Sequence, residues 1–253
     1  MERHASQANG SAVSELVIKV VHDNSAYADT LKTAWGFSAC IVGPDKTILF
    51  DTGSDGSLLL ENMAKLHIEP ARIDLVVLSH VHGDHTGGVA GFLQANPRVD
   101  VYLPQPFPAR FKEGVRGYGA GVVEVNEPQD ICTHVFTTGV VGRLIKEQAL
   151  VIRTTRGLVI LTGCAHPGVT KMMEAARRLS GEDILLVMGG FHLEWATARK
   201  AERIVAAFRG YGVRYVAPTH CTGDKARELF QRHYGEHYID VGAGKTLALA
   251  GLT

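Results

Sequence analysis

A dense run of metal-binding side chains directly after an apolar segment constrains the fold of this chain more than any other feature. Residues 73–78, Ile-Asp-Leu-Val-Val-Leu, read as a buried strand. The following run, Ser-His-Val-His-Gly-Asp-His-Thr-Gly-Gly, holds three imidazoles and one carboxylate within six positions: His80, His82, Asp84 and His85. Donors at this density are typical of a metal site, whereas a solvated polar turn would need none of them. We therefore expect a sheet with a metal site at one strand end.

Three glycines, Gly83, Gly87 and Gly88, lie among these donors. Glycine lacks a Cβ and adopts backbone conformations that other residues avoid. We expect the three glycines to let the backbone bend tightly around two divalent ions, with Zn²⁺ the first choice and Mn²⁺ or Fe as alternatives.

Composition excludes several classes of function. The 253 residues are 45% hydrophobic and 21% charged, so the chain can bury a full core. Twenty-six basic side chains balance 26 acidic ones, so no overall field favours nucleic acid or a membrane surface. The sequence has neither a membrane-length apolar run nor a signal-like start, which predicts a cytoplasmic protein. The partner we expect is a small-molecule substrate. Gly242–Thr246 and Gly117–Gly121 each lack a glycine that nucleotide-binding loops require, so we expect no nucleotide cofactor.

Hydrophobic periodicity indicates an α/β fold. Strands are predicted over 16–21, 36–42, 47–50, 73–78, 149–153, 158–161, 184–188 and 213–217, and helices over 57–66, 169–179, 196–208 and 224–233. Sheets from both halves with helices outside them would form a four-layer αββα sandwich. We expect a flexible leader at 1–14 and a single metallo-hydrolase domain at 15–253. The glycine- and proline-rich stretch 104–127 is interpreted either as an active-site loop or as a surface excursion.

The pattern His-x-His-x-Asp-His at a strand end resembles the defining motif of the metallo-β-lactamase superfamily. The resemblance implies that His80 and His82 bind one ion and that Asp84 and His85 bind a second. Asp51 resembles a structural aspartate that supports the metal loop by hydrogen bonding. His220, after the strand 213–217, resembles the last metal ligand of the family.

The chain departs from the family pattern between these motifs. Cys164 stands where a bridging aspartate is expected, and Glu147 stands where a third histidine is expected. His166, Glu147 and His192 compete to complete the first ion site; we favour His166, with Cys164 next, because both follow a predicted strand. Cys164 is equally well explained as a small buried apolar residue, and Cys221 as packing. His192 is the candidate to lie behind the ligands or to contact substrate.

Further motifs narrow the resemblance to one branch of the family. They are Gly-Cys-Ala-His-Pro-Gly (163–168), Gly-Gly-Phe-His-Leu (189–193) and Pro-Thr-His-Cys-Thr-Gly (218–223), with His-Asp-Asn at 22–24 and Gly-Phe-Ser at 36–38. The branch includes synthases that make 7,8-dihydropterin-6-ylmethyl-4-(β-D-ribofuranosyl)aminobenzene-5′-phosphate. Its name implies a phosphorylated substrate.

We therefore predict a binuclear hydrolase that uses a metal-activated hydroxide on a phosphoester, most simply a phosphodiester. Asp84 would orient the nucleophile, and His192 would assist the leaving group. The alternatives are a synthase-like transferase and a hydrolase of lactones, carboxylic esters or sulfate esters. Iron-dependent oxygen or nitric oxide chemistry and a non-enzymatic metal-binding role carry less weight.

Overall fold

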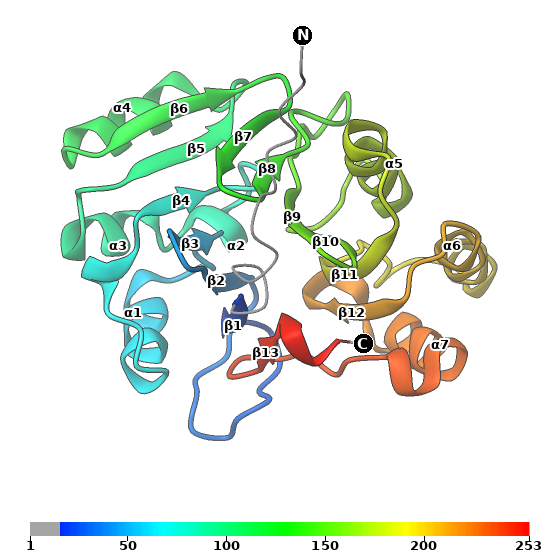
Figure 1. The fold of residues 1–253 in the computed structure, drawn as a ribbon. Coiled ribbons are helices and arrows are strands. Elements are labelled where there is room, and N and C mark those ends of the chain that lie inside the picture. Colours follow the sequence, from blue (N-terminus) through cyan, green and yellow to red (C-terminus); the bar gives the residue numbers. More distant parts are fainter. Residues whose placement is uncertain (1–15, 253) are drawn as a thin grey trace, which may run out of the picture.

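Two β-sheets pack face to face in the computed structural model, which describes residues 16–252 (Figure 1). The first sheet has seven strands, built mainly from the first half of the chain. In spatial order they are β13 (Thr246–Ala248), β1 (Val17–His22), β2 (Ser38–Val42), β3 (Thr47–Phe50), β4 (Leu75–Val77), β5 (Asp100–Pro104) and β6 (Gly121–Val125). Strands β3 to β6 run parallel, while β13, β1, β2 and β3 pair antiparallel. The predicted leader at 1–14 lies outside the described residues.

The second sheet has six strands from the second half of the chain. In spatial order they are β12 (Tyr215–Thr219), β11 (Ile184–Gly190), β10 (Gly157–Thr162), β9 (Leu150–Thr154), β8 (Val135–Thr137) and β7 (Gln129–Cys132). Strands β10, β11 and β12 are parallel to one another. Their carboxyl ends therefore lie along one edge of this sheet, where loops carry functional side chains in many α/β proteins.

Helices cover the outer face of each sheet (Figure 1). The first sheet is flanked by α1 (Gly56–Lys65), α3 (Val89–Ala95) and α4 (Ala109–Gly117), and the second by α5 (Val169–Ser180), α6 (Ala198–Gly210) and α7 (Asp224–Tyr234). Short 3₁₀ turns lie at Pro70–Arg72, His220–Thr222, Gly235–His237 and Leu249–Gly251. No helix within residues 16–252 combines the length and the apolar character needed to cross a lipid bilayer.

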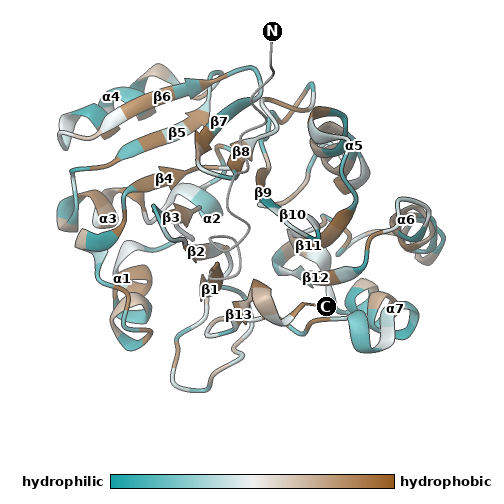
Figure 2. Cartoon of the chain, in the orientation of Figure 1, coloured by the Kyte–Doolittle hydropathy of each residue, from teal (hydrophilic) through white to brown (hydrophobic). Residues whose placement is uncertain are grey.

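Three apolar clusters fill the three spaces between the layers. One lies between the sheets and includes Phe37 just before β2, Phe50 of β3 and Met188 of β11. The other two separate each sheet from its helices. Figure 2 shows the apolar strands inside and the more polar helix faces outside. The four-layer αββα sandwich predicted from the sequence is therefore the observed architecture.

The interpretation of 104–127 as an irregular loop was wrong. The segment forms helix α4 and strand β6, which pairs in parallel with β5. Most glycines of this segment lie at the boundaries of α4 and β6. Gly117 is the last residue of α4, and Gly121 is the first residue of β6. Gly119, with a φ of +94°, lies in the connection between them. Glycines at element boundaries interrupt the sequence periodicity without breaking the elements.

Candidate metal centre

Four of the predicted donor residues lie directly after the end of β4. The chain leaves the strand through Leu78 and Ser79, passes His80 and His82, and enters the short helix α2 (Gly83–Thr86), which carries Asp84 and His85. The helix is closed by a hydrogen bond from the His85 amide to the His82 carbonyl. One strand end and one helical turn therefore position all four predicted donors.

The glycines of this loop serve close packing and not tight bending, which corrects the sequence interpretation. None of the three has a positive φ. A Cβ on Gly87 would lie 2.2 Å from the Ser54 carbonyl oxygen, and a Cβ on Gly88 would lie 2.2 Å from the Thr52 carbonyl oxygen. Gly83 has open space around it. Two of the three glycines therefore let α2 approach the loop that follows β3.

Three imidazoles form the first donor group: His80, His82 and His166. Their ring centroids are 4.6 to 4.7 Å apart in all three pairs. Burial is the main reason that the pKa of His80 falls to about 3, which keeps its ring in the neutral form that binds metals. Its Nε2 is buried and has no hydrogen-bond partner in the described part of the chain.

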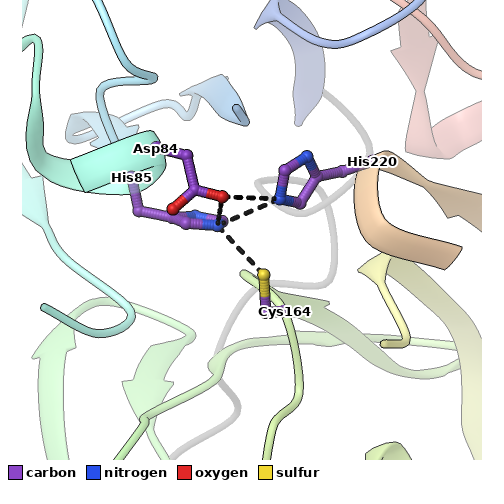
Figure 3. Close-up of side chains that lie close together, drawn as sticks. All are labelled: Asp84, His85, Cys164 and His220. Carbon is purple, nitrogen blue, oxygen red and sulfur yellow. Dashed lines mark hydrogen bonds and ion pairs between the residues drawn. The ribbon is translucent and has the colours of Figure 1, made fainter. Parts of the chain in front are cut away.

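The second donor group contains Asp84, His85, Cys164 and His220 (Figure 3). His85 Nε2 lies 3.1 Å from Cys164 Sγ and 3.2 Å from His220 Nε2. Asp84 Oδ2 lies 3.3 Å from His220 Nε2 and 3.6 Å from His85 Nε2. Tetrahedral ligands with bonds of 2.0 to 2.3 Å are about 3.3 to 3.8 Å apart. The two Asp84 distances lie in this range and the two from His85 Nε2 lie just below it, so the four donors are close enough to share one ion.

Hydrogen bonds behind the rings make a cation the simplest explanation of this close approach. His85 Nδ1 lies 2.7 Å from Asp51 Oδ2, and His220 Nδ1 lies 3.0 Å from Asn24 Oδ1. Asn24 Oδ1 also accepts the Gly36 amide, which identifies it as the oxygen. Both Nδ1 atoms therefore donate, and the two Nε2 lone pairs point toward each other. Two neutral imidazoles in this arrangement repel unless a metal ion or a proton lies between the two Nε2 atoms.

Asp51 hydrogen-bonds the donor loop that follows β4, as the family resemblance implies. Its Oδ1 accepts the Ser79 amide at 2.7 Å, and its Oδ2 accepts the Ser79 hydroxyl and His85 Nδ1, both at 2.7 Å. Ser79 Oγ also lies 2.9 Å from His80 Nδ1. Burial raises the pKa of Asp51 to about 7. One carboxyl group therefore orients an imidazole of each donor group.

Glu147 hydrogen-bonds the loop that carries Cys164 and His166. It is fully buried, its Oε1 accepts the amides of Cys164 and Ala165, and its Oε2 accepts the amide and Nδ1 of His166, at 2.7 to 3.1 Å. Burial raises the pKa of Glu147, but His80 and these hydrogen bonds outweigh it and lower the pKa to about 2. Of the candidates weighed from the sequence, the structure brings His166 to His80 and His82, and Cys164 to the other group.

His192 lies beside the first donor group. Its ring is half-buried, and the ring centroid is 4.5 Å from that of His166. It belongs to neither donor group. Cys221 is buried, and its thiol contacts the Cys164 carbonyl at 3.7 Å, in agreement with a packing role.

Backbone strain concentrates at this centre. Of the six non-glycine residues with positive φ among the described residues, four are Asp51, Ala165, His192 and His220. Such conformations cost free energy and persist where the surrounding structure enforces them, as at functional sites.

Two supporting residues were missed by the sequence analysis. Asn24 binds both the carbonyl and the Nδ1 of His220. Trp35 donates its indole N–H to Asp84 Oδ2 at 3.0 Å. The run His-Asp-Asn at 22–24 was noted as a motif, but its role depends on a contact across 196 positions that no local pattern reveals.

Residues 35–169, more than half of the chain, match the profile of the metallo-beta-lactamase superfamily. The chain belongs to the metallo-β-lactamase superfamily. Within this superfamily it is similar to a 7,8-dihydropterin-6-methyl-4-(beta-D-ribofuranosyl)-aminobenzene-5'-phosphate synthase of Methanocaldococcus jannaschii. The two sequences are 30% identical over 81% of this chain and 85% of the relative.

Solved metallo-β-lactamase structures agree with this assignment. Tm1679, described as a metal-dependent hydrolase of the beta-lactamase superfamily, superposes with a TM-score of 0.77 and 31% identity, over 92% of this chain and 98% of that protein. YhfI of Bacillus subtilis superposes with a TM-score of 0.69 and 12% identity, over 92% of this chain and 99% of that protein. The second likeness concerns the fold alone.

Proposed function

We propose that this protein is a binuclear metal-dependent hydrolase that cleaves an ester bond in a phosphorylated small molecule. One observation carries the proposal: seven donor side chains converge in two groups, and hydrogen bonds aim the Nε2 lone pairs of His85 and His220 at a common point. We assign His80, His82 and His166 to one ion and Asp84, His85, Cys164 and His220 to the other. Zn²⁺ suits this mixture of imidazole, thiolate and carboxylate, with Mn²⁺ or Fe as alternatives.

The chemistry of the two ions, when bound, is to lower the pKa of a coordinated water toward about 7 and to offset charge that develops on the ester. The protein supplies orientation and charge. Hydrogen bonding with Cys221, followed by burial, raises the pKa of Cys164, so its thiol keeps the proton until a cation is near. With an ion bound, Asp84 and a Cys164 thiolate would provide two negative charges against one divalent ion.

Two further side chains have proposed roles toward the substrate. Asp84 is half-buried and its Oδ2 accepts from Trp35, so the carboxylate is held in one orientation at the side of the centre that solvent reaches. It would orient the nucleophile. His192 lies beside His166, where its ring can donate a hydrogen bond or a proton to the leaving group.

A phosphoester is the proposed substrate class because the M. jannaschii relative is named for a phosphate-bearing product. The described similarity to a metal-dependent hydrolase supports hydrolysis as the reaction. The test is a screen of the metal-loaded protein against phosphomonoesters, phosphodiesters, phosphotriesters, lactones, carboxylic esters and aryl sulfates, with the metal content measured. We expect about two Zn²⁺ or Mn²⁺ ions per chain and turnover of a phosphoester. Tightly bound iron with oxygen consumption would contradict the proposal.

A synthase-like transferase is the second candidate, favoured by the 30% identity to the M. jannaschii synthase over most of both chains. Such a reaction would join two organic fragments and release a phosphate-containing leaving group, where a hydrolase would transfer the group to water. Product analysis separates the two. Formation of a coupled product when an aromatic amine acceptor is added, without hydrolysis in its absence, would favour the transferase.

A further inference from the structure

Both tryptophans of the chain lie beside the proposed metal centre and expose large apolar surfaces. The exposed fraction is 45% for Trp35 and 78% for Trp195. Isolated exposed apolar side chains are common and need no explanation. Here, however, the only two indoles of the sequence flank the same cluster of donor side chains, one on each side.

Trp35 is fixed against the second donor group. Its indole N–H donates to Asp84 Oδ2 at 3.0 Å, and its ring centroid lies 5.0 Å from that of His220. The backbone next to it is also fixed, because the Gly36 amide donates to Asn24 Oδ1 and the Phe37 amide donates to the Asp84 carbonyl. Since the N–H is occupied, the part of Trp35 that faces solvent is a ring surface held in place.

Trp195 is positioned beside the first donor group. Its ring centroid is 6.5 Å from that of His192, which in turn lies 4.5 Å from His166. The segment before it is anchored by hydrogen bonds from the amides of Leu193 and Glu194 to the Cys221 carbonyl. Cys221 directly follows His220, so the segment that carries Trp195 is tied to the second donor group as well.

We propose that Trp35 and Trp195 form a binding subsite for a planar aromatic group of the substrate, next to the ester phosphate. The inference rests on the proposed function, because it takes the ligand of the metals to be the substrate. Indole faces bind flat rings by stacking and dispersion, and fixed aromatic side chains lose little conformational entropy in doing so. The substrate class is therefore an aryl or heteroaryl phosphoester. Trp35 contacts Asp84 and His220, and the Trp195 ring lies beside His192, so a small molecule bound at the donor groups would have an indole surface next to it on either side.

The binding test uses non-hydrolysable phosphonates of similar size and equal charge. Phenylphosphonate and cyclohexylphosphonate are titrated calorimetrically into the metal-loaded wild type and into Trp195→Ala, Trp195→Phe and Leu179→Ala. We expect the wild type to bind the phenyl compound about two- to tenfold more tightly, as one aromatic contact provides. Trp195→Ala should lose this preference, Trp195→Phe should keep most of it, and Leu179→Ala should keep all of it. Leu179 is the matched control because it is exposed on α5, away from both tryptophans.

A fluorescence measurement locates the ring. The variant Trp35→Phe leaves Trp195 as the one indole in the chain, and 4-nitrophenylphosphonate quenches indole emission. Saturable quenching, with the dissociation constant that calorimetry gives for the same ligand and the same variant, supports the subsite. Quenching that rises linearly without saturation overturns it, as does an equal preference for the phenyl compound in the wild type and Trp195→Ala. Loss of self-association in Trp195→Ala, with no change in the preference, would assign the exposed rings to a contact between copies and also overturn it.

These experiments distinguish failure of the aromatic subsite from failure of the proposed hydrolase function. Ring-selective binding of the phosphonates without turnover of phenyl phosphate would leave the subsite standing and remove the hydrolase. Equal turnover of phenyl and cyclohexyl phosphate by the wild type and Trp195→Ala would leave the hydrolase standing and remove the subsite.

Discussion

Glu147 accepts four hydrogen bonds from three consecutive residues of the loop that carries Cys164 and His166. No other described carboxylate holds both donor-bearing residues of that loop. The loop includes Ala165 with a φ of +57°, a conformation that its own side chain does not favour. The carboxylate therefore compensates for local strain and fixes where two proposed ligands point.

The substitution Glu147→Gln tests this role. The amide nitrogen would face backbone N–H donors, so at least one buried group loses its partner, and we expect the free energy of unfolding of the metal-free protein to fall by about 3 kcal/mol near neutral pH. Affinity for the first ion should fall about 10- to 100-fold. Urea unfolding and metal titration measure the two effects. Unchanged stability would contradict the role.

The difference in unfolding free energy between the wild type and Glu147→Gln should depend on pH, because the pKa of Glu147 is shifted in the folded protein. The pKa is lowered from 4.5 to about 2 in the folded protein, so its carboxylate stabilises the fold above pH 4.5 and loses this contribution between pH 4.5 and 2. The stability difference between wild type and Glu147→Gln should therefore be full at pH 6 and shrink toward pH 3. A difference that stays constant over this range would exclude an ionised Glu147.

Asn24 should affect how tightly the second donor group binds its ion, although Asn24 is not itself a proposed ligand. Asn24→Ala removes the acceptor of His220 Nδ1 and frees the ring to adopt the other tautomer. We expect affinity for the second ion to fall about 10- to 100-fold. The absorption of the Cys164 thiolate bound to Co²⁺ reports on this group alone. Asn24→Asp keeps the acceptor and is the matched control; equal loss in both variants would refute the orientation argument.

At the scale of elements, strand ends decide where the chemistry lies. Asp51 follows β3 and His80 follows β4, while Cys164, His192 and His220 follow β10, β11 and β12. Because each of these sets of strands is parallel, their carboxyl ends meet at one edge of each sheet. Donor side chains far apart in sequence therefore meet there: His85 and His220 are 135 positions apart, and their Nε2 atoms lie 3.2 Å from each other.

This arrangement explains what could be predicted from the sequence. The donors on the β4 loop share a local motif, so a cluster of metal-binding side chains there was predictable from their density, whereas their division between two ions followed only from the family resemblance. The division of Cys164 and His166 between two groups depends on how Glu147, 17 to 19 residues earlier, turns the loop. No pattern within the loop encodes that turn. Similarly, α4 was missed because its helical character depends on packing against β6 and α3 and not on periodicity alone.

A pair of glycine substitutions tests the contact between the two edges. A Cβ on Gly163 would lie 2.0 Å from Ser79 Oγ and 3.0 Å from Asp51 Oδ2, so Gly163→Ala pushes the β10 end away from the metal loop. We expect a loss of about 3 kcal/mol in stability and weaker binding of both ions. Gly114→Ala, inside α4 with open space around it, should instead stabilise by about 0.5 to 1 kcal/mol. Circular dichroism during thermal unfolding compares the two. Equal effects would show that the close approach at Gly163 is unimportant.

For the whole molecule, the proposed ions join two halves that otherwise meet mainly through apolar packing. Each donor group takes residues from both sheets: His80 and His82 with His166, and Asp84 and His85 with Cys164 and His220. An ion in either group therefore binds the folded arrangement and not the unfolded chain. Its binding free energy becomes stability of the assembled sandwich.

Removal of metal should consequently lower the stability of the entire fold. At a free Zn²⁺ concentration a thousand times the dissociation constant, each ion contributes about 4 kcal/mol. Chelation should lower the melting temperature, and Zn²⁺ should restore it. In His166→Ala the shift should shrink and the bound metal should fall by about one equivalent per chain. A melting temperature independent of chelator would contradict the assignment of the donor groups.

The pairing of β13 with β1 has a consequence for the order in which the protein assembles. It joins residues 17–19 to residues 246–248, so this edge of the first sheet cannot close until a segment more than 220 positions downstream is available. A chain under synthesis therefore leaves the backbone groups of β1 open on one side while the rest of the sheet is already able to form. Since His220 also arrives late, the nascent protein passes through a stage in which β1 is uncovered and the second donor group lacks one of its four side chains. During that interval it is most exposed to aggregation and to capture by chaperones.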